Sequence, residues 1–256
     1  MIKVIFFDID GTLVSHKTKS VPESAQAAIE SLRARGIKCV MCTGRHILEI
    51  DELPVHDMEF DAYITLVGQL CLDGDKKPVA AFPFTGEERD RMVALFNERR
   101  YPMQLVEQDG MYINFVNDRV RQVQAEISTS IPPLGEYGGN AVYQAVVYVD
   151  EAEEKAISDS TAGCYVTRWN RQAVDVLPGG GGKILGMKEY LRATGVDVSE
   201  TMAFGDGDND ADMLRFAGIG VAMGNAVDVT KQSADYVTDH IDEDGVAKAL
   251  RHFGLI

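Results

Sequence analysis

Two acidic side chains stand two residues apart where the first apolar run of the chain ends. Asp8 and Asp10 follow Ile-Lys-Val-Ile-Phe-Phe and precede Gly11 and Thr12. Residues two apart in an extended chain face the same way, so these carboxylates should converge just beyond a strand. Carboxylates this close repel each other unless a cation joins them, and Mg²⁺ accepts one or two carboxylates together with water and a phosphate oxygen. A solvated acidic loop would explain a bare Asp-x-Asp, but this pentapeptide after an apolar strand favours a functional site.

A second acidic group, Gly-Asp-Gly-Asp-Asn-Asp over 205–210, directly follows another apolar run. It lacks the spacing and the closing Glu of a calcium loop. The carboxyl ends of parallel strands meet at one edge of a sheet, so this group should lie near Asp8. We expect Asp206, nearest the strand end, to bind the metal and Asp210 to orient its neighbours. Asp208 fits a solvated position.

Two further segments could bind an anion. Thr43 and Gly44 follow a strand and open a predicted helix, where a hydroxyl and free backbone N–H groups suit phosphate, although an ordinary helix cap explains them as well. Lys183 falls in the first turn of a later predicted helix, where the helix dipole disfavours a cation unless an anion is also present. Glycines precede Lys183, but their spacing does not match a P-loop.

Together these groups have the composition needed for phosphoryl transfer. Asp8 would be the nucleophile, and Asp10 the general acid that protonates the leaving oxygen and then the base that activates water. Mg²⁺, Lys183, Thr43 and Asn209 would balance the charge on the transferred phosphoryl oxygens.

The elements that must position these residues alternate at both ends of the chain. The pattern predicts strands at 2–7, 37–42 and 63–67 with a helix at 22–35 between the first two, then helices at 183–194, 211–217 and 244–252 with strands at 201–204, 220–222 and 236–237. Strand and helix in this rhythm indicate a Rossmann-like α/β core of three layers around a parallel sheet, formed by residues 1–83 and 179–256.

The rhythm differs over 84–178, which predicts a separate α+β unit inserted into the core. Its expected elements are helices at 85–100, 118–128 and 151–160, a hairpin at 103–116 turning at Asp109-Gly110, a strand at 141–149 and a strand pair over 165–176.

Composition narrows the class of protein. The 256 residues carry a net charge of −15 without any block of Lys and Arg, so neither nucleic acid nor an anionic membrane surface is an expected partner. The N-terminal apolar run is interrupted by Lys3 and does not predict a signal peptide, and no run is long enough for a membrane span. The four cysteines fit core positions rather than disulfides, which favours a cytoplasmic protein. The sequence does not define an oligomeric state, and a monomer is compatible with it.

At this point the chain resembles the haloacid dehalogenase superfamily of phosphatases. The resemblance rests on the 8–12 pentapeptide, Thr43-Gly44-Arg45, Lys183 and the 205–210 cluster, in that order. The position of the insert is similar to class IIB, Cof-type members, as are Gly-Val-Ala-Met-Gly-Asn-Ala at 220–226 and Ala-Asp-Tyr-Val-Thr at 234–238. Within that class, the chain is most similar to sugar-phosphate phosphatases, in particular those acting on hexose phosphates.

The resemblance implies a role for each matched position. Asp8 and Asp206 would bind Mg²⁺ through side chains, and Asp10 through its backbone carbonyl. The phosphate would be held by Ile9, Thr43, Gly44, Lys183 and Asn209. One departure is Val67-Gly68, where the class often has Asn-Gly, which weakens the assignment of a substrate contact to the end of the third strand.

The insert would then act as a cap that sets specificity and excludes water. Arg168, Trp169 and Asn170 are its first candidates for contacting a sugar, because an aromatic face beside polar groups suits that ligand. A cap strand anchored by its Trp explains the same residues.

Two other functions remain open. A phosphomutase would use the same chemistry but return the phosphoryl group to a sugar hydroxyl. A non-catalytic phospho-aspartate module of the receiver type would need the acidic sheet edge and a Lys, but neither Asp10 nor an insert.

Overall fold

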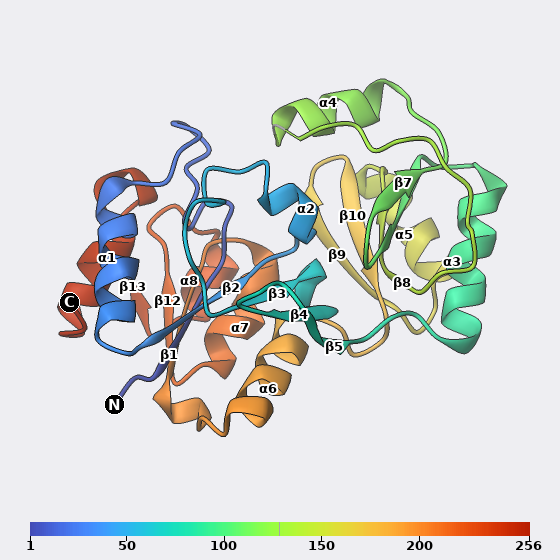
Figure 1. Cartoon of the computed structure of the whole chain (residues 1–256). Helices are drawn as coiled ribbons and strands as arrows, with labels where there is room; N and C mark the ends of the chain where they lie inside the picture. Colours follow the sequence, from blue (N-terminus) through green and yellow to red (C-terminus); the bar gives the residue numbers. More distant parts are fainter. Residues whose placement is uncertain (128) are drawn as a thin grey trace. The chain divides into compact units, whose positions relative to one another are not determined.

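The computed structural model describes residues 1–127 and 129–256 (Figure 1). The chain divides into two compact units, one made of residues 1–80 and 183–256 and the other of residues 81–182. The insert expected from the sequence, 84–178, begins three residues later and ends four residues earlier than the second unit. We call the two parts the core unit and the inserted unit.

The core unit is built on one eight-stranded sheet. Its strand order is β13-β12-β11-β1-β2-β3-β4-β5. The first six are parallel, whereas β4 runs antiparallel to β3. The strands are β1 Val4–Phe7, β2 Lys38–Cys42, β3 Ala62–Thr65, β4 Leu70–Asp73, β5 Pro78–Ala81, β11 Thr201–Gly205, β12 Ile219–Ala222 and β13 Tyr236–Val237. The parallel-sheet core is confirmed.

The sequence analysis missed β4 and β5. A turn with three successive positive φ angles separates β3 from β4, at Leu66 (52°), Val67 (54°) and Gly68 (93°). The predicted strand at 63–67 therefore ends at Thr65, and Leu66–Gly68 form the short 3₁₀ helix η1. A β-branched residue rarely adopts this backbone conformation, so the turn has no signal in the residue types. The side chains of β5 are mostly exposed and show no apolar alternation.

Helices cover both faces of this sheet, which gives the expected three layers. Val4 and Phe6 of β1 share an apolar cluster with Met187 of α6 and Leu214 of α7. On the other face, α1 packs against α9 (Figure 1). The helices of the core unit are α1 Glu23–Ala34, α2 Ile47–Ile50, α6 Lys183–Thr194, α7 Ala211–Phe216, α8 Asp228–Gln232 and α9 Gly245–His252, with 3₁₀ turns η2 Val198–Glu200, η3 Asp208–Asp210 and η4 Ile241–Glu243.

The inserted unit has an antiparallel sheet of order β7-β6-β8-β10-β9. One face of this sheet packs against Met92 and Phe96 of α3 and Ile157 of α5. The elements are α3 Gly86–Glu98, β6 Met103–Glu107, β7 Met111–Ile113, α4 Asp118–Glu126, β8 Val142–Val147, α5 Glu151–Ser160, β9 Tyr165–Asn170 and β10 Ala173–Leu177. The helix predicted at 118–128 corresponds to α4, and its expected end at residue 128 lies outside the described residues.

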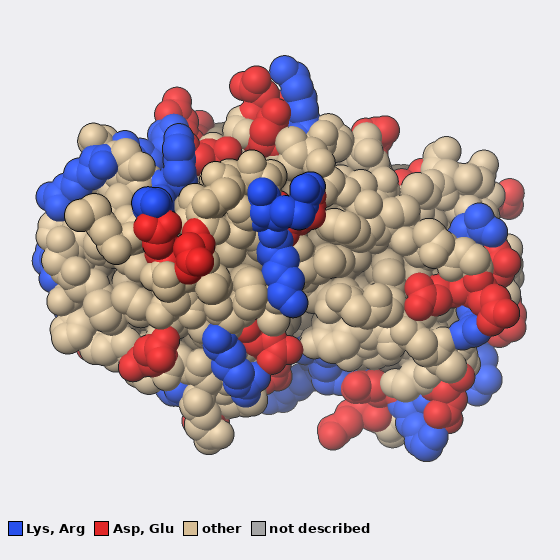
Figure 2. All heavy atoms as spheres, turned by 90° about the horizontal axis from the view of Figure 1, so that it is seen from below, with Lys and Arg blue, Asp and Glu red and all other residues tan. Residues whose placement is uncertain are grey.

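The surface carries charged side chains of both signs. On the face seen in Figure 2, basic side chains are scattered among acidic ones rather than gathered into one patch. Within residues 1–127 and 129–256, none of the helices has the length and apolar character needed to cross a membrane.

Candidate active site

The centre of the site is a buried lysine between two carboxylates. Lys183, the first residue of α6, donates hydrogen bonds from Nζ to Asp8 Oδ1 at 2.5 Å and to Asp210 Oδ1 at 2.6 Å. Its side chain is 0% exposed. A cation at this end of a helix is stable only beside anions, and the structure places two carboxylates there. The anions beside Lys183 in this structure are therefore Asp8 and Asp210, and its contact with phosphate stays a prediction.

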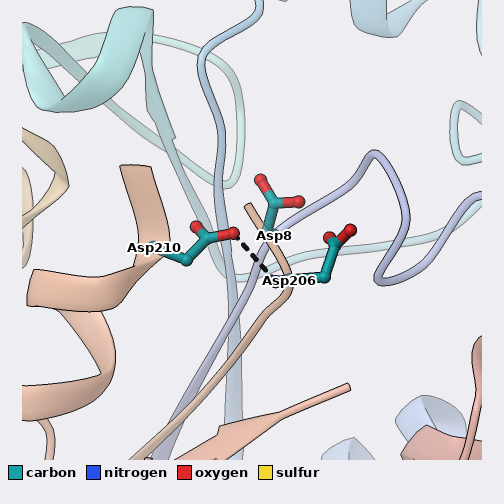
Figure 3. A group of neighbouring side chains, drawn as sticks. All are labelled: Asp8, Asp206 and Asp210. Carbon is teal, nitrogen blue, oxygen red and sulfur yellow. Dashed lines mark hydrogen bonds between the residues drawn. The ribbon is translucent and has the colours of Figure 1, made fainter. Parts of the chain in front are cut away.

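Asp210 holds the loop over residues 205–210 together through hydrogen bonds to its backbone. Its Oδ2 accepts the backbone N–H groups of Asp206 at 3.0 Å and Gly207 at 2.9 Å, and the first of these bonds is drawn in Figure 3. A Cβ on Gly205 would lie only 2.5 Å from the Asp210 Cβ, so the loop can close over Asp210 only with glycine there. With Lys183 on its other oxygen, Asp210 joins the lysine to the loop that carries Asp206, and its orienting role stays a prediction.

Asp206 lies at the end of β11, opposite Asp8 at the end of β1. Thr12 Oγ1 donates to Asp206 Oδ1 at 2.9 Å. A Cβ on Gly11 would lie 2.1 Å from Asp206 Oδ2, and Gly11 also has a φ of +82°. Any other residue at position 11 would displace the carboxylate. The tight turn after β1 therefore lets Asp206 approach the first strand.

These three aspartates form the candidate metal centre. One carboxylate oxygen from each of Asp8, Asp206 and Asp210 lies within 4.8 Å of the others (Figure 3). Oxygen donors of this kind fit a hard cation such as Mg²⁺. Because Asp210 is already bonded to Lys183 and two amides, Asp8 and Asp206 are the better placed ligands.

The electrostatics of these two carboxyl groups support a cation site. Burial, followed by the charge of Asp210, raises the pKa of Asp8 to about 7. Burial, followed by the charge of Asp8, raises the pKa of Asp206 to about 8. A divalent cation between them would offset this repulsion and favour the ionised forms.

Metal binding should therefore depend on pH. At pH values between 3.8 and the raised pKa values, Asp8 and Asp206 keep protons in the folded metal-free protein that they have released in the unfolded chain. The stability of the metal-free protein therefore falls as the pH rises through this range. Mg²⁺ needs the ionised carboxylates, so it should raise the unfolding temperature more at pH 8.5 than at pH 6. Thermal unfolding of metal-free and Mg²⁺-loaded protein measures this. Asp206→Asn should lose most of the Mg²⁺ effect, and an equal effect at both pH values would contradict the assignment.

Asp10 has a partner that the sequence analysis did not assign. Arg45 donates from Nε to Asp10 Oδ2 at 2.6 Å and from Nη2 to Asp10 Oδ1 at 2.8 Å. Burial tends to raise the pKa of Asp10, but the hydrogen bonds and charge of Arg45 outweigh it and hold that pKa below its usual value. The expectation that Asp8 and Asp10 converge on a cation thus needs refinement, since the Asp10 carboxylate is neutralised by Arg45.

The prediction that a helix opens at Thr43 and Gly44 is wrong. Helix α2 begins at Ile47, and the side chain of His46 caps it by accepting from Leu48 N. Thr43 is 1% exposed, and its Oγ1 accepts the N–H of Arg45 at 3.2 Å. The segment is instead a partly buried loop after β2, without the helix N-terminus that the anion argument required.

The remaining core candidates lie in the same loops. The carbonyl of Ile9 accepts N–H groups from Thr12, Leu13 and Val14, which closes the loop after β1. Asn209 lies in η3, in the loop that carries Asp206.

The inserted-unit candidates differ in what their side chains contact. The Arg168 guanidinium donates to Glu154 and to four backbone carbonyl oxygens, so it organises its own unit. Asn170 is bonded to Glu126 and to the N–H of Gln172. Trp169 Nε1 donates to Asp175 Oδ1 at 2.9 Å, and Asp175 is 5% exposed. The sequence analysis did not select Asp175, although a charged residue inside the strand Ala-Val-Asp-Val-Leu was a signal for it.

Comparison with known proteins identifies relatives over the whole chain. The family model described as haloacid dehalogenase-like hydrolase matches residues 5–250. The Bacillus subtilis (strain 168) protein YkrA is 31% identical over 257 residues, covering 99% of this chain and 98% of its own. The structure of BT1666 from Bacteroides thetaiotaomicron, reported among phosphatases of this superfamily, has a TM-score of 0.88 at 35% identity, covering 100% and 96% of the two chains. The subclass IIB sugar phosphatase BT4131 has a TM-score of 0.89 at 37% identity, covering 99% and 100%.

Proposed function

The chain belongs to the haloacid dehalogenase-like hydrolase family, and from this premise we propose that it is a Mg²⁺-dependent phosphatase that carries the phosphoryl group on Asp8. The hydrolysis of phosphoric monoesters follows from the family and its phosphatase members. The observation that supports the role of Asp8 best is its position, at the end of the central strand β1, beside both Lys183 and Asp206.

Asp8 and Asp206 would hold Mg²⁺ by their side chains and Asp10 by its backbone carbonyl. When bound, the cation neutralises the carboxylates and the phosphate so that two anions can approach each other. Lys183 already neutralises the Asp8 oxygen that it contacts, which leaves the other oxygen as the nucleophile.

Two steps transfer the phosphoryl group from the ester to water. In the first, an Asp8 oxygen bonds to phosphorus, the ester O–P bond breaks, and the leaving oxygen takes a proton from Asp10. In the second, water attacks the phosphorus of the aspartyl phosphate and gives a proton to Asp10. The bond from phosphorus to Asp8 breaks, and inorganic phosphate leaves with both residues restored.

Arg45 fits the second step directly. Its ion pair favours the ionised form of Asp10, which is the form that accepts a proton from water. For the first step Asp10 must carry a proton, so we propose that Arg45 turns toward the anionic substrate when it binds and loosens the pair. Ile9, Thr43, Gly44, Lys183 and Asn209 remain the proposed phosphate-binding residues.

A sugar phosphate is the proposed substrate class. Gln104, Val146, Asp175 and Thr167 lie directly opposite one another on neighbouring strands, so they share one face of the inserted sheet. This is the face opposite the apolar cluster under α3 and α5. The buried Asp175 carboxylate, bonded to the indole of Trp169, offers an acceptor and an aromatic surface, and the buried Gln104 amide lies two strands farther along the same face; a polyol requires groups of these kinds.

A phosphate-release screen tests this function. Sugar phosphates, nucleotides and cofactor phosphates are assayed with Mg²⁺ and with EDTA, and we expect turnover only with the metal and best on a sugar phosphate. Asp175→Asn should raise the KM for that sugar by about 10-fold and leave p-nitrophenyl phosphate nearly unaffected. Asp159→Asn, an exposed position on α5 of the same unit, is the matched control. Absence of turnover for every small ester would refute the proposal, and a need for an activating bisphosphate would indicate a mutase.

We also propose a cytoplasmic location. Support comes from the cysteines, which are free, with Cys39, Cys42 and Cys71 buried. Burial raises the pKa of Cys39 to about 12, as expected of an unreactive core thiol.

A further inference from the structure

Asn225 lies outside every group of residues assigned to the chemistry so far, yet it contacts two of their loops. It occupies the turn after β12. Its Nδ2 donates to the Gly11 carbonyl at 2.7 Å and to Asp206 Oδ2 at 3.3 Å, and its Oδ1 accepts the N–H of Ile241 at 3.0 Å. One side chain therefore joins the loops that follow β1 and β11 to the turn η4.

Only an amide satisfies these three contacts. The position requires two donor hydrogens on one atom and an acceptor on the other. An aspartate offers no donor, a serine or threonine offers one, and a glutamine is one methylene longer. The residue type at 225 is therefore matched to its partners.

The contacts define how Asp206 is held. Thr12 donates to its Oδ1 and Asn225 to its Oδ2, so each oxygen receives one hydrogen bond from a neutral group. Asp8 and Asp210, by contrast, both bond to the cation of Lys183. Neutral donors fix the orientation of the Asp206 carboxylate without cancelling its charge, which remains available to a metal ion.

The turn that carries Asn225 is itself held firmly. Gly224 N donates to Asp239 O, and Val227 N donates to Asp206 O, both at 3.0 Å. A Cβ on Gly224 would lie 2.5 Å from His240 N, so the backbone segments meet without space for a side chain. The turn that carries Asn225 is therefore tied by backbone hydrogen bonds both to Asp239, in the segment before η4, and to Asp206.

We propose that Asn225 is a positioning residue that sets the Mg²⁺ affinity of the site by orienting Asp206 and the Gly11 turn. This inference rests on the proposed metal-dependent function. It assigns no contact between Asn225 and substrate, so the effect should appear in metal binding before it appears in the chemical step.

Calorimetric titration of metal-free protein with Mg²⁺, without substrate, is the primary test. Asn225→Ala should weaken Mg²⁺ binding by about 10- to 100-fold, the usual effect of losing an outer-shell partner, while kcat at saturating Mg²⁺ falls by no more than about threefold. Ser24→Ala is the matched control, since it removes another long-range hydrogen bond, to Asp244, that involves none of Asp8, Asp206 and Asp210. Its Mg²⁺ affinity should not change.

Asn225→Asp keeps the shape and the acceptor for Ile241 but gives up both donors. We expect it to weaken Mg²⁺ binding and to shift the preference toward Ca²⁺ by about 10-fold, because Ca²⁺ accepts more oxygen ligands in looser geometry. If both variants bind Mg²⁺ as the wild type does and lose only stability or kcat, Asn225 is merely structural and the inference fails.

The two proposals can fail separately. Wild-type protein that binds Mg²⁺ in the calorimeter but hydrolyses no phosphate ester would refute the phosphatase function, and the affinities of the variants would still decide the role of Asn225. Wild-type protein that binds no Mg²⁺ would refute both.

Discussion

Asp8→Asn is expected to lower phosphate release by at least about 10⁴-fold, because an amide cannot replace a carboxylate as the nucleophile. The fold should survive this change. Lys183 keeps Asp210 as a partner at 2.6 Å, and the repulsion between Asp8 and its acidic neighbours disappears. Steady-state phosphate release and thermal unfolding of the same preparation measure the two effects. A folded Asp8→Asn protein with wild-type turnover would refute the nucleophile assignment.

Asp10→Asn separates the nucleophile from the acid and base. With a sugar phosphate, whose alkoxide leaving group needs a proton, turnover should fall by about 10²- to 10⁴-fold. With p-nitrophenyl phosphate the leaving group needs no proton, so the variant should release one equivalent of nitrophenol rapidly and then turn over slowly. This burst requires Asp8 to be phosphorylated, and its absence in the Asp8→Asn, Asp10→Asn double variant is the control.

Lys183→Met is expected to lower both stability and activity strongly. Removing one partner of a buried ion pair typically costs about 3–5 kcal/mol, because the remaining charges are left uncompensated. Here two carboxylates, Asp8 and Asp210, would lose their shared cation at a site where the lysine is 0% exposed. Burial raises the pKa of Asp8 to about 7, so protonation of Asp8 offers relief at low pH, and the loss of unfolding free energy should be larger at pH 8 than at pH 5.

Urea unfolding at the two pH values measures this loss. Lys188→Met is the matched control, because Lys188 is an exposed lysine on the same helix. Its ammonium lies near the ring of Phe216. It should change the unfolding free energy by less than about 1 kcal/mol. Phosphate release by Lys183→Met should also be nearly lost, because a protonated Asp8 is a poor nucleophile. A variant as stable as the wild type at both pH values would contradict the role of Lys183 in holding the carboxylates.

The arrangement of the core and its acidic residues could be predicted because it depends on the order and direction of the strands. Once β1 and β11 are recognised as parallel neighbours, their carboxyl ends meet at one edge whatever the loops do. Asp8 and Asp206 follow those ends directly, so their approach required no knowledge of loop conformation. Lys183 was recognised from the helix dipole alone.

The features that were missed depend on loops meeting in three dimensions. Arg45 pairs with Asp10 across loops from different strands, and no spacing in the sequence encodes that approach. The start of α2 was misplaced because its cap is His46, which is not among the residues that usually signal a helix start. Asn225 acts through three contacts with residues 16 to 214 positions away.

Within the inserted unit, residue type gave candidates for substrate binding but not which of their side chains are available to a ligand. Arg168 was selected for its charge, yet its donors bond to the protein itself. Trp169 stays a prediction for substrate binding, and its bond to Asp175 adds a partner that sequence reasoning had passed over.

The boundary between the two units falls between Gly182 and Lys183. The inserted unit therefore ends immediately before the lysine on which the carboxylates depend, and it contains none of Asp8, Asp10, Asp206 or Asp210. This makes the protein a natural recipient for domain exchange: residues 81–182 can be replaced by the corresponding segment of a relative while the reacting groups stay on the recipient. Gly180 and Gly182 have φ angles of 77° and 126°, so a graft should keep these two glycines to deliver Lys183 to the first turn of its helix.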